Sequence, residues 1–181
     1  MRVKQGRRGI KTKDIVLMAV MIALKIILSQ FTIYITPTFK VFSLAYLPGA
    51  MVSILYGPGL GMLFGLVADT VGYFAKPAGP YFFGYAISEM VAGLIYGLFL
   101  YKKPLKVWRI AASRVSIMII VTFGLNYIWS YLLYGSVFSK YYNWVRIANN
   151  LIQMPISIIL ILVMGRLVLR LQGEYYAYGV D

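Results

Sequence analysis

Two carboxylates interrupt long apolar stretches of this sequence, where lipid would make a charge costly. Asp69 lies within the apolar run 60–75, and Glu89 lies within the run 81–101. Ionisable residues inside membrane-spanning segments commonly mark a binding or transport pathway. A carboxylate can accept hydrogen bonds from adjacent N–H donors of a ring. Asp69 is therefore a candidate ligand contact.

A second set of polar residues lies near the start of the apolar segment 143–169. Arg146, Asn149, Asn150 and Gln153 are three or four residues apart, which places them on one face of a helix. Amides pair with ring donors and acceptors, and arginine pairs with a carboxylate. The alternative role of Arg146 is an anchor that reaches the lipid headgroups, and that of the amides is hydrogen bonding between helices.

Further candidates fall on the same predicted side of the membrane. They are Asn126, Trp129, Lys40, Tyr81 and Phe82. Aromatic rings supply flat walls for a planar ligand. The half of the bundle predicted to face outward thus collects an acid, cations, amides and aromatic rings, and the inner half carries no comparable group. These residues indicate an outward-facing pocket for a small molecule.

Lys25 and Glu89 are predicted to lie near the middle of two different helices. An unpaired charge at the bilayer centre costs about 2.5–3.5 kcal/mol on insertion scales. An ion pair between the two helices would offset that cost, so we predict a structural Lys25–Glu89 pair. A gating or ligand role is the alternative.

The composition shows which elements must position these groups. Of 181 residues, 61% are hydrophobic and 13% are charged, which is too apolar for a soluble domain of this size. A helix needs about 20 residues to cross a bilayer. We predict an all-α membrane protein with six transmembrane helices, at about 14–33, 43–56, 60–75, 81–101, 108–134 and 143–169. Pro48-Gly49 should bend or break the second helix, and segments 34–42 and 135–142 should be loops.

The positive charges predict the orientation. Eighteen Lys and Arg oppose five Asp and Glu, but they flank the apolar segments instead of forming one patch, which argues against nucleic-acid binding. Cytoplasmic loops carry the excess of Lys and Arg, so both termini are predicted to be cytoplasmic. We divide the chain into a basic tail (1–13), a single transmembrane domain (14–169) and a C-terminal tail (170–181), placed in the cell membrane.

The sequence lacks the residues that several classes of function require. The absence of Cys and His removes disulfides, thiol nucleophiles and imidazole bases, and no metal site is predicted. The glycines at 57, 59, 61 and 65 have no following Lys-Ser/Thr, so they do not form a phosphate-binding loop. Ser88 and Glu89 are adjacent on a helix and point to different faces. The sequence predicts neither an enzyme nor a cofactor of its own.

Three motifs resemble those of a known family: Gly57-Pro-Gly59, Gly79-Pro-Tyr-Phe and Gly93-Leu-Ile-Tyr-Gly-Leu-Phe-Leu-Tyr-Lys-Lys103. Over about residues 14–170 the chain resembles the substrate-binding S component of an energy-coupling factor (ECF) vitamin transporter, most of all its folate-specific branch. The resemblance implies high-affinity capture of folate from outside. It also implies docking on a transmembrane coupling protein with two ATPases, so that the partners use the ATP.

The resemblance also suggests roles for individual residues. Ala19 and Ala23 share one helix face, on which small residues allow close helix approach, and this face would dock on the coupling protein. Asp69 would contact the pterin ring of folate, and Arg146 and Lys40 would contact its glutamate carboxylates. The alternatives are an S component for another vitamin (riboflavin or a pyrimidine precursor) and a membrane assembly protein whose polar face binds another helix.

Overall fold

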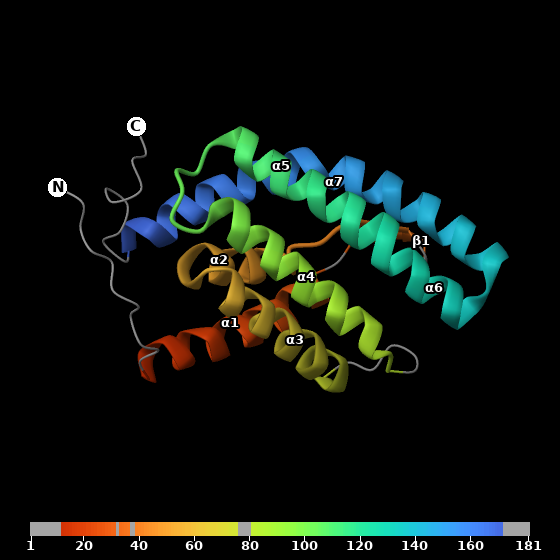
Figure 1. Cartoon of the computed structure of the whole chain (residues 1–181), viewed down its shortest axis with the longest axis horizontal. Coiled ribbons are helices and arrows are strands. Elements are labelled where there is room, and N and C mark those ends of the chain that lie inside the picture. Colours follow the sequence, from red (N-terminus) through yellow and green to blue (C-terminus); the bar gives the residue numbers. More distant parts are fainter. Residues whose placement is uncertain (1–11, 32, 37–38, 76–80, 172–181) are drawn as a thin grey trace.

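The computed structural model describes residues 12–31, 33–36, 39–75 and 81–171, with only the backbone described at 33–36, 39–42 and 136–146. It is an elongated bundle of helices, which confirms the predicted all-α class (Figure 1). The helices are α1 (Thr12–Gln30), α2 (Leu47–Tyr56), α3 (Pro58–Ala75), α4 (Phe83–Leu100), α5 (Val107–Ile117), α6 (Asn126–Tyr134) and α7 (Ser136–Leu171), with a π-helix, Met118–Leu125, joining α5 to α6.

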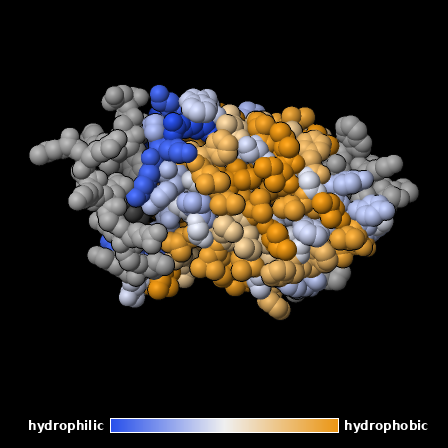
Figure 2. Space-filling view, viewed as in Figure 1, coloured by the Kyte–Doolittle hydropathy of each residue, from blue (hydrophilic) through white to orange (hydrophobic). Residues whose placement is uncertain are grey.

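The bundle has the surface of a multi-pass membrane protein. In the described part of the chain, four segments are long and apolar enough to cross a membrane: α3, α4, the continuous segment Val107–Tyr134, and Ile147–Leu171 within α7. On the face shown in Figure 2, hydrophobic side chains cover the middle of the bundle, and hydrophilic ones gather at one end, over the α4–α5 connection. This distribution suits a bilayer around the middle.

Helix α2 differs from its prediction. Pro48 lies in the first turn, where its missing N–H costs no helical hydrogen bond, so the proline begins the helix instead of breaking it. The ten residues of α2 extend only about 15 Å, and eight of them are buried. The helix packs against α1, α3, α4 and α7. It therefore forms the centre of the bundle and cannot cross a membrane alone.

Other local expectations are also corrected. The segment 34–42, predicted as a loop, forms an antiparallel hairpin of β1 (Ile33–Thr36) and β2 (Phe39–Phe42), and α1 ends before it at Gln30 instead of residue 33. The loop predicted at 135–142 is replaced by helix, because Gly135 (φ 79°) turns the chain in one residue before α7 begins. The helix predicted at 108–134 contains an eight-residue π-helical segment.

Helices α3 and α4 approach each other at glycines. A Cβ atom added to Gly93 of α4 would collide with the carbonyl oxygen of Gly61 of α3. A Cβ atom added to Gly65 of α3 would lie 2.6 Å from the carbonyl carbon of Glu89. Small residues four apart allow such close backbone contact between membrane helices. The glycines therefore fix the distance between the helices that carry Asp69 and Glu89.

We expect Gly65→Ala to lower the free energy of unfolding by about 1–3 kcal/mol, the usual cost of overpacking. The matched control is Gly72→Ala on the same helix, whose added Cβ would meet only Ile26, at 3.9 Å. This control should be neutral or stabilising, because alanine favours a helix by about 0.8–1.0 kcal/mol over glycine. Thermal unfolding in detergent measures both, and equal midpoints would show that the α3–α4 contact does not require glycine.

Candidate functional site

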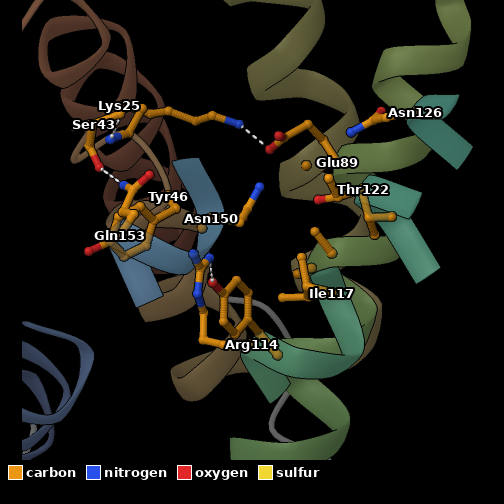
Figure 3. Close-up of a pocket in the computed structure, with 18 of the residues that line it drawn as sticks. Lys25, Ser43, Tyr46, Glu89, Arg114, Ile117, Thr122, Asn126, Asn150 and Gln153 are labelled. Atoms are coloured by element: carbon orange, nitrogen blue, oxygen red, sulfur yellow. Dashed lines mark hydrogen bonds and ion pairs between the residues drawn. The ribbon is translucent and has the colours of Figure 1, made fainter. Parts of the chain in front are cut away.

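A cavity of about 380 Å³ lies inside the bundle, and its walls come from α1, α2, α3, α4, α7, the continuous α5–α6 segment and the connection before α2. Small-molecule sites have volumes of about 300–1,000 Å³. Figure 3 shows Lys25 and Glu89 at one end of the cavity and Arg114 at the other. Phe64 of α3 adds an aromatic wall. The cavity thus has two polar ends and can hold an elongated ligand.

The first polar end, the Arg114 cluster, consists of Arg114, Tyr46 and Tyr96, and Asn149 of α7 lines the same cavity. Arg114 is only 9% exposed, donates from Nη1 to the Tyr96 hydroxyl at 3.0 Å, and lies 5.0 Å over the ring of Tyr46. The Arg114 Nε, the Tyr46 hydroxyl and the Asn149 Oδ1 are buried without a hydrogen-bond partner. Buried polar atoms are normally paired. All three residues line the cavity, so these atoms are available to a ligand.

The second polar end is the ion pair between Lys25 and Glu89, which confirms the predicted pairing. Lys25 Nζ lies 2.6 Å from Glu89 Oε2, and their side chains are 14% and 45% exposed. Both residues line the cavity. Asp69 of α3 lies close enough to interact electrostatically with both members of the pair, but it is not part of the cavity wall. The predicted acid is therefore adjacent to the site.

Asn126 of α6 lines the cavity and is held from behind. The Ser88 hydroxyl donates to Asn126 Oδ1 at 2.8 Å, and Trp129 Nε1 donates to the Ser88 hydroxyl at 3.2 Å. Trp129 also packs on Phe82, with ring centres 5.6 Å apart. Trp129 and Phe82 thus support the wall without lining it.

The α7 amides are brought together as the helical spacing predicts. Asn149, Asn150 and Gln153 all line the cavity. Gln153 Nε2 donates to the carbonyl of Ser43, which ties the connection before α2 to α7. The side chains of Arg146 and Lys40 lie outside the described residues, so their roles stay predictions.

Tyr81 lies away from the cavity. It is 37% exposed, its hydroxyl is 3.1 Å from that of Thr70, and its ring packs against Tyr73 with centres 4.9 Å apart. It belongs to an aromatic cluster at the α3–α4 end of the bundle.

Sequence reasoning missed the Arg114 cluster. An arginine within an apolar span commonly marks a functional site, and Arg114 is such a residue. Tyr46 gave no such signal, since its place depends on α2 beginning inside the bundle. Arg114 precedes Asn126 by twelve residues, roughly 18 Å of helix. The polar lining therefore extends much deeper than the outer half predicted for it.

Lys25→Met should destabilise the protein, because Glu89 loses its cation. Removing one partner of a buried pair costs about 3–5 kcal/mol, and the partial exposure of Glu89 should bring this closer to the roughly 1 kcal/mol of exposed pairs. The double change Lys25→Met, Glu89→Met should recover much of the loss. Unfolding midpoints in detergent measure the effect, and a double variant no more stable than the single one would contradict a stabilising pair.

Comparison with known proteins places the chain in a family. The profile described as "ECF transporter, substrate-specific component" matches residues 13–165. Folate transporter FolT of Clostridium novyi (strain NT) is 31% identical over 162 residues, which cover 90% of this chain and 93% of the relative. Folate transporter FolT of Leuconostoc mesenteroides is 29% identical over 156 residues, with 81% of each chain covered.

A solved structure agrees with these relatives. It is described as "Crystal structure of FolT bound with folic acid", is 31% identical to this chain and has a TM-score of 0.75. The match covers 86% of this chain and 93% of that one. The sequence match and the shared fold thus extend over nearly the whole bundle. The chain belongs to the family of substrate-specific components of ECF transporters.

Proposed function

We propose that this protein is the folate-binding S component of an ECF transporter in the cell membrane, which captures folate from outside and delivers it inward. The observation that carries the proposal is that buried polar atoms of Arg114, Tyr46 and Asn149, all without partners, belong to residues that line one cavity. The relatives named as folate transporters and the FolT structure bound with folic acid support folate as the ligand.

The Arg114 cluster suits the pterin end of folate better than its glutamate end. Arg114 Nε–H is a donor, the Tyr46 hydroxyl can donate or accept, and Asn149 Oδ1 is an acceptor. A pterin ring carries acceptors beside N–H donors and can satisfy all three, whereas a carboxylate only accepts. A carboxylate here would leave Asn149 Oδ1 unpaired, at a cost of about 1–3 kcal/mol. We therefore assign the pterin to this end.

The rest of folate then extends past Phe64 toward the Lys25–Glu89 end. Its glutamate carboxylates would face the outer opening, where Lys40 and Arg146 remain the proposed contacts. We assign Asp69 an electrostatic role beside Lys25 and Glu89, since it lies outside the cavity wall. Asn126, Asn150 and Gln153 are proposed to contact the middle of the ligand, with Trp129, Phe82 and Tyr81 as supporting aromatic residues.

We propose that both termini are cytoplasmic and that the protein docks on a transmembrane coupling protein with two ATPases. Ala19 and Ala23 are exposed on α1, which suits a docking face for the coupling protein. The ATPases would consume the ATP, so this chain would bind and release folate unchanged and need no cofactor.

The co-purifying ligand tests the function directly. The protein purified from its native membrane should carry a pterin absorption spectrum. The ligand-free protein should show a change in tryptophan fluorescence on folate addition, because Trp129 lies behind the wall at Asn126. A flavin spectrum would instead favour the riboflavin alternative. No ligand and no fluorescence response would favour an assembly protein.

A further inference from the structure

Lys25 and Glu89 connect two helices whose backbones do not approach each other closely. In the described part of the chain, α1 packs against α2 and α3, and no backbone packing joins α1 to α4. The extended Lys25 side chain spans this gap to reach Glu89 Oε2 at 2.6 Å. Figure 3 shows it reaching across one end of the cavity. The pair thus forms a bridge over that end.

The bridge lies between the Arg114 cluster and the end of the bundle that holds the hairpin. Lys25 is five residues before the end of α1, and Glu89 is six residues after the start of α4. Arg114 lies in the opposite half of the continuous α5–α6 segment. A ligand that enters from the hairpin end therefore meets the bridge before it reaches the Arg114 cluster.

The bridge has the properties of an element that can open. A charge-assisted hydrogen bond of 2.6 Å holds it closed. The Glu89 side chain is 45% exposed and lines the cavity, so a polar ligand in the cavity can reach the pair. Because no backbone packing joins α1 to α4, breaking this pair would open the gap that the Lys25 side chain spans.

We infer that the Lys25–Glu89 pair is a gate, which closes the cavity between α1 and α4 and must open before a ligand reaches Arg114. The inference rests on the proposed function in one respect, namely that the ligand enters from the hairpin end. Opening the gate would break this side-chain link between α4 and α1, the helix that carries the exposed Ala19 and Ala23.

Labelling of single cysteines tests the gate without any ligand, because the chain has no cysteine of its own. Ile117→Cys reports on the depth of the cavity, since Ile117 lines it and is 8% exposed. Gln30→Cys, at the end of α1, reports on reagent outside the gate. A small neutral methanethiosulfonate reagent should modify Ile117→Cys about tenfold faster when Lys25→Met and Glu89→Met are added.

The charge-swapped background Lys25→Glu, Glu89→Lys re-forms the pair and should restore slow labelling at position 117. The rate at Gln30→Cys should stay the same in all three backgrounds. If the labelling rate of Ile117→Cys does not change when the pair is neutralised, the gate is overturned. So would a charge swap that labels as fast as the neutral pair.

Where neutral variants fail to fold, a reversible cross-link replaces them. Lys25→Cys and Glu89→Cys can be joined by a cleavable bis-methanethiosulfonate spacer, because the backbones are too far apart for a direct disulfide. In a protein without a cysteine at position 117, the closed cross-link should block the tryptophan-fluorescence response to folate, and reductant should restore it. An unchanged response in the cross-linked protein would overturn the gate.

Folate kinetics separate a gate from a ligand contact. Stopped-flow tryptophan fluorescence should show folate association about tenfold faster in the neutral pair than in the wild-type protein. Faster dissociation with unchanged association would make the pair a ligand contact and overturn the gate. No folate binding by the wild-type protein would instead refute the proposed function, and the labelling experiment would still decide the gate.

Discussion

Arg114→Met should raise the Kd for folate about 100-fold and leave the bundle folded. A hydrogen bond to a charged group contributes about 1.5–3 kcal/mol, and a 100-fold change corresponds to about 2.8 kcal/mol. Arg114 is buried against Tyr96 and Tyr46 with its Nε toward no protein partner, so truncation removes a donor from the ligand. Tryptophan-fluorescence titration measures the Kd, and thermal unfolding checks the fold.

Two variants and a second ligand sharpen this test. Arg114→Lys keeps the charge but loses the planar fork, so its Kd should lie between those of wild type and Arg114→Met. Asp69→Asn changes an acid outside the cavity wall and should have a smaller effect than either. Pteroate lacks the glutamate of folate. The Arg114→Met substitution should raise the Kd for pteroate by the same factor as the Kd for folate. An unchanged Kd for pteroate in the Arg114→Met variant would instead place the glutamate carboxylates of folate at Arg114.

Hydropathy predicted the helices because a span must satisfy every backbone polar group within itself. It could not predict where each helix lies in the bundle. The ten-residue α2 has the composition of a membrane span, and its short length becomes meaningful only because the surrounding helices cover it. The π-helical segment 118–125 also cannot be predicted from hydropathy periodicity. In an almost continuously apolar sequence, no apolar stripe marks how many residues make one helical turn. Such segments often occur at functional sites, and Thr122 within it lines the cavity.

The candidate site shows the same division. The amide face of α7 follows from helical periodicity alone, and the Lys25–Glu89 pair follows from the cost of unpaired charges at equal depth. The location of Asp69 outside the wall depends on how α3 is rotated against α4, which the glycine contacts determine. Arg114 was visible as an intramembrane cation, but its phenolic partners come from α4 and from the residue before α2. No local pattern connects them.

Small residues four apart have different outcomes on different helices. On α3 and α4, glycines bring two helices of this chain into backbone contact. On α1, Ala19 and Ala23 are exposed, and none of the α1 residues is buried. The flanking side chains Val16, Val20 and Ile27 are more than half exposed. The α1 face therefore has small residues that allow close helix approach, but no helix of this chain covers it. Such a face suits packing against a helix of another protein.

Ala23→Arg should therefore reduce folate uptake to background while leaving the Kd for folate unchanged. An arginine on this face would hold a partner helix away and place an unpaired charge in the interface, which typically costs several kcal/mol. Ala23→Ser keeps the side chain small and should retain uptake, and Ala19→Arg should repeat the loss. Uptake in cells and folate titration of the purified variants provide the two measurements. Loss of binding together with uptake would mean that this face shapes the cavity, whereas normal uptake would move docking to another surface.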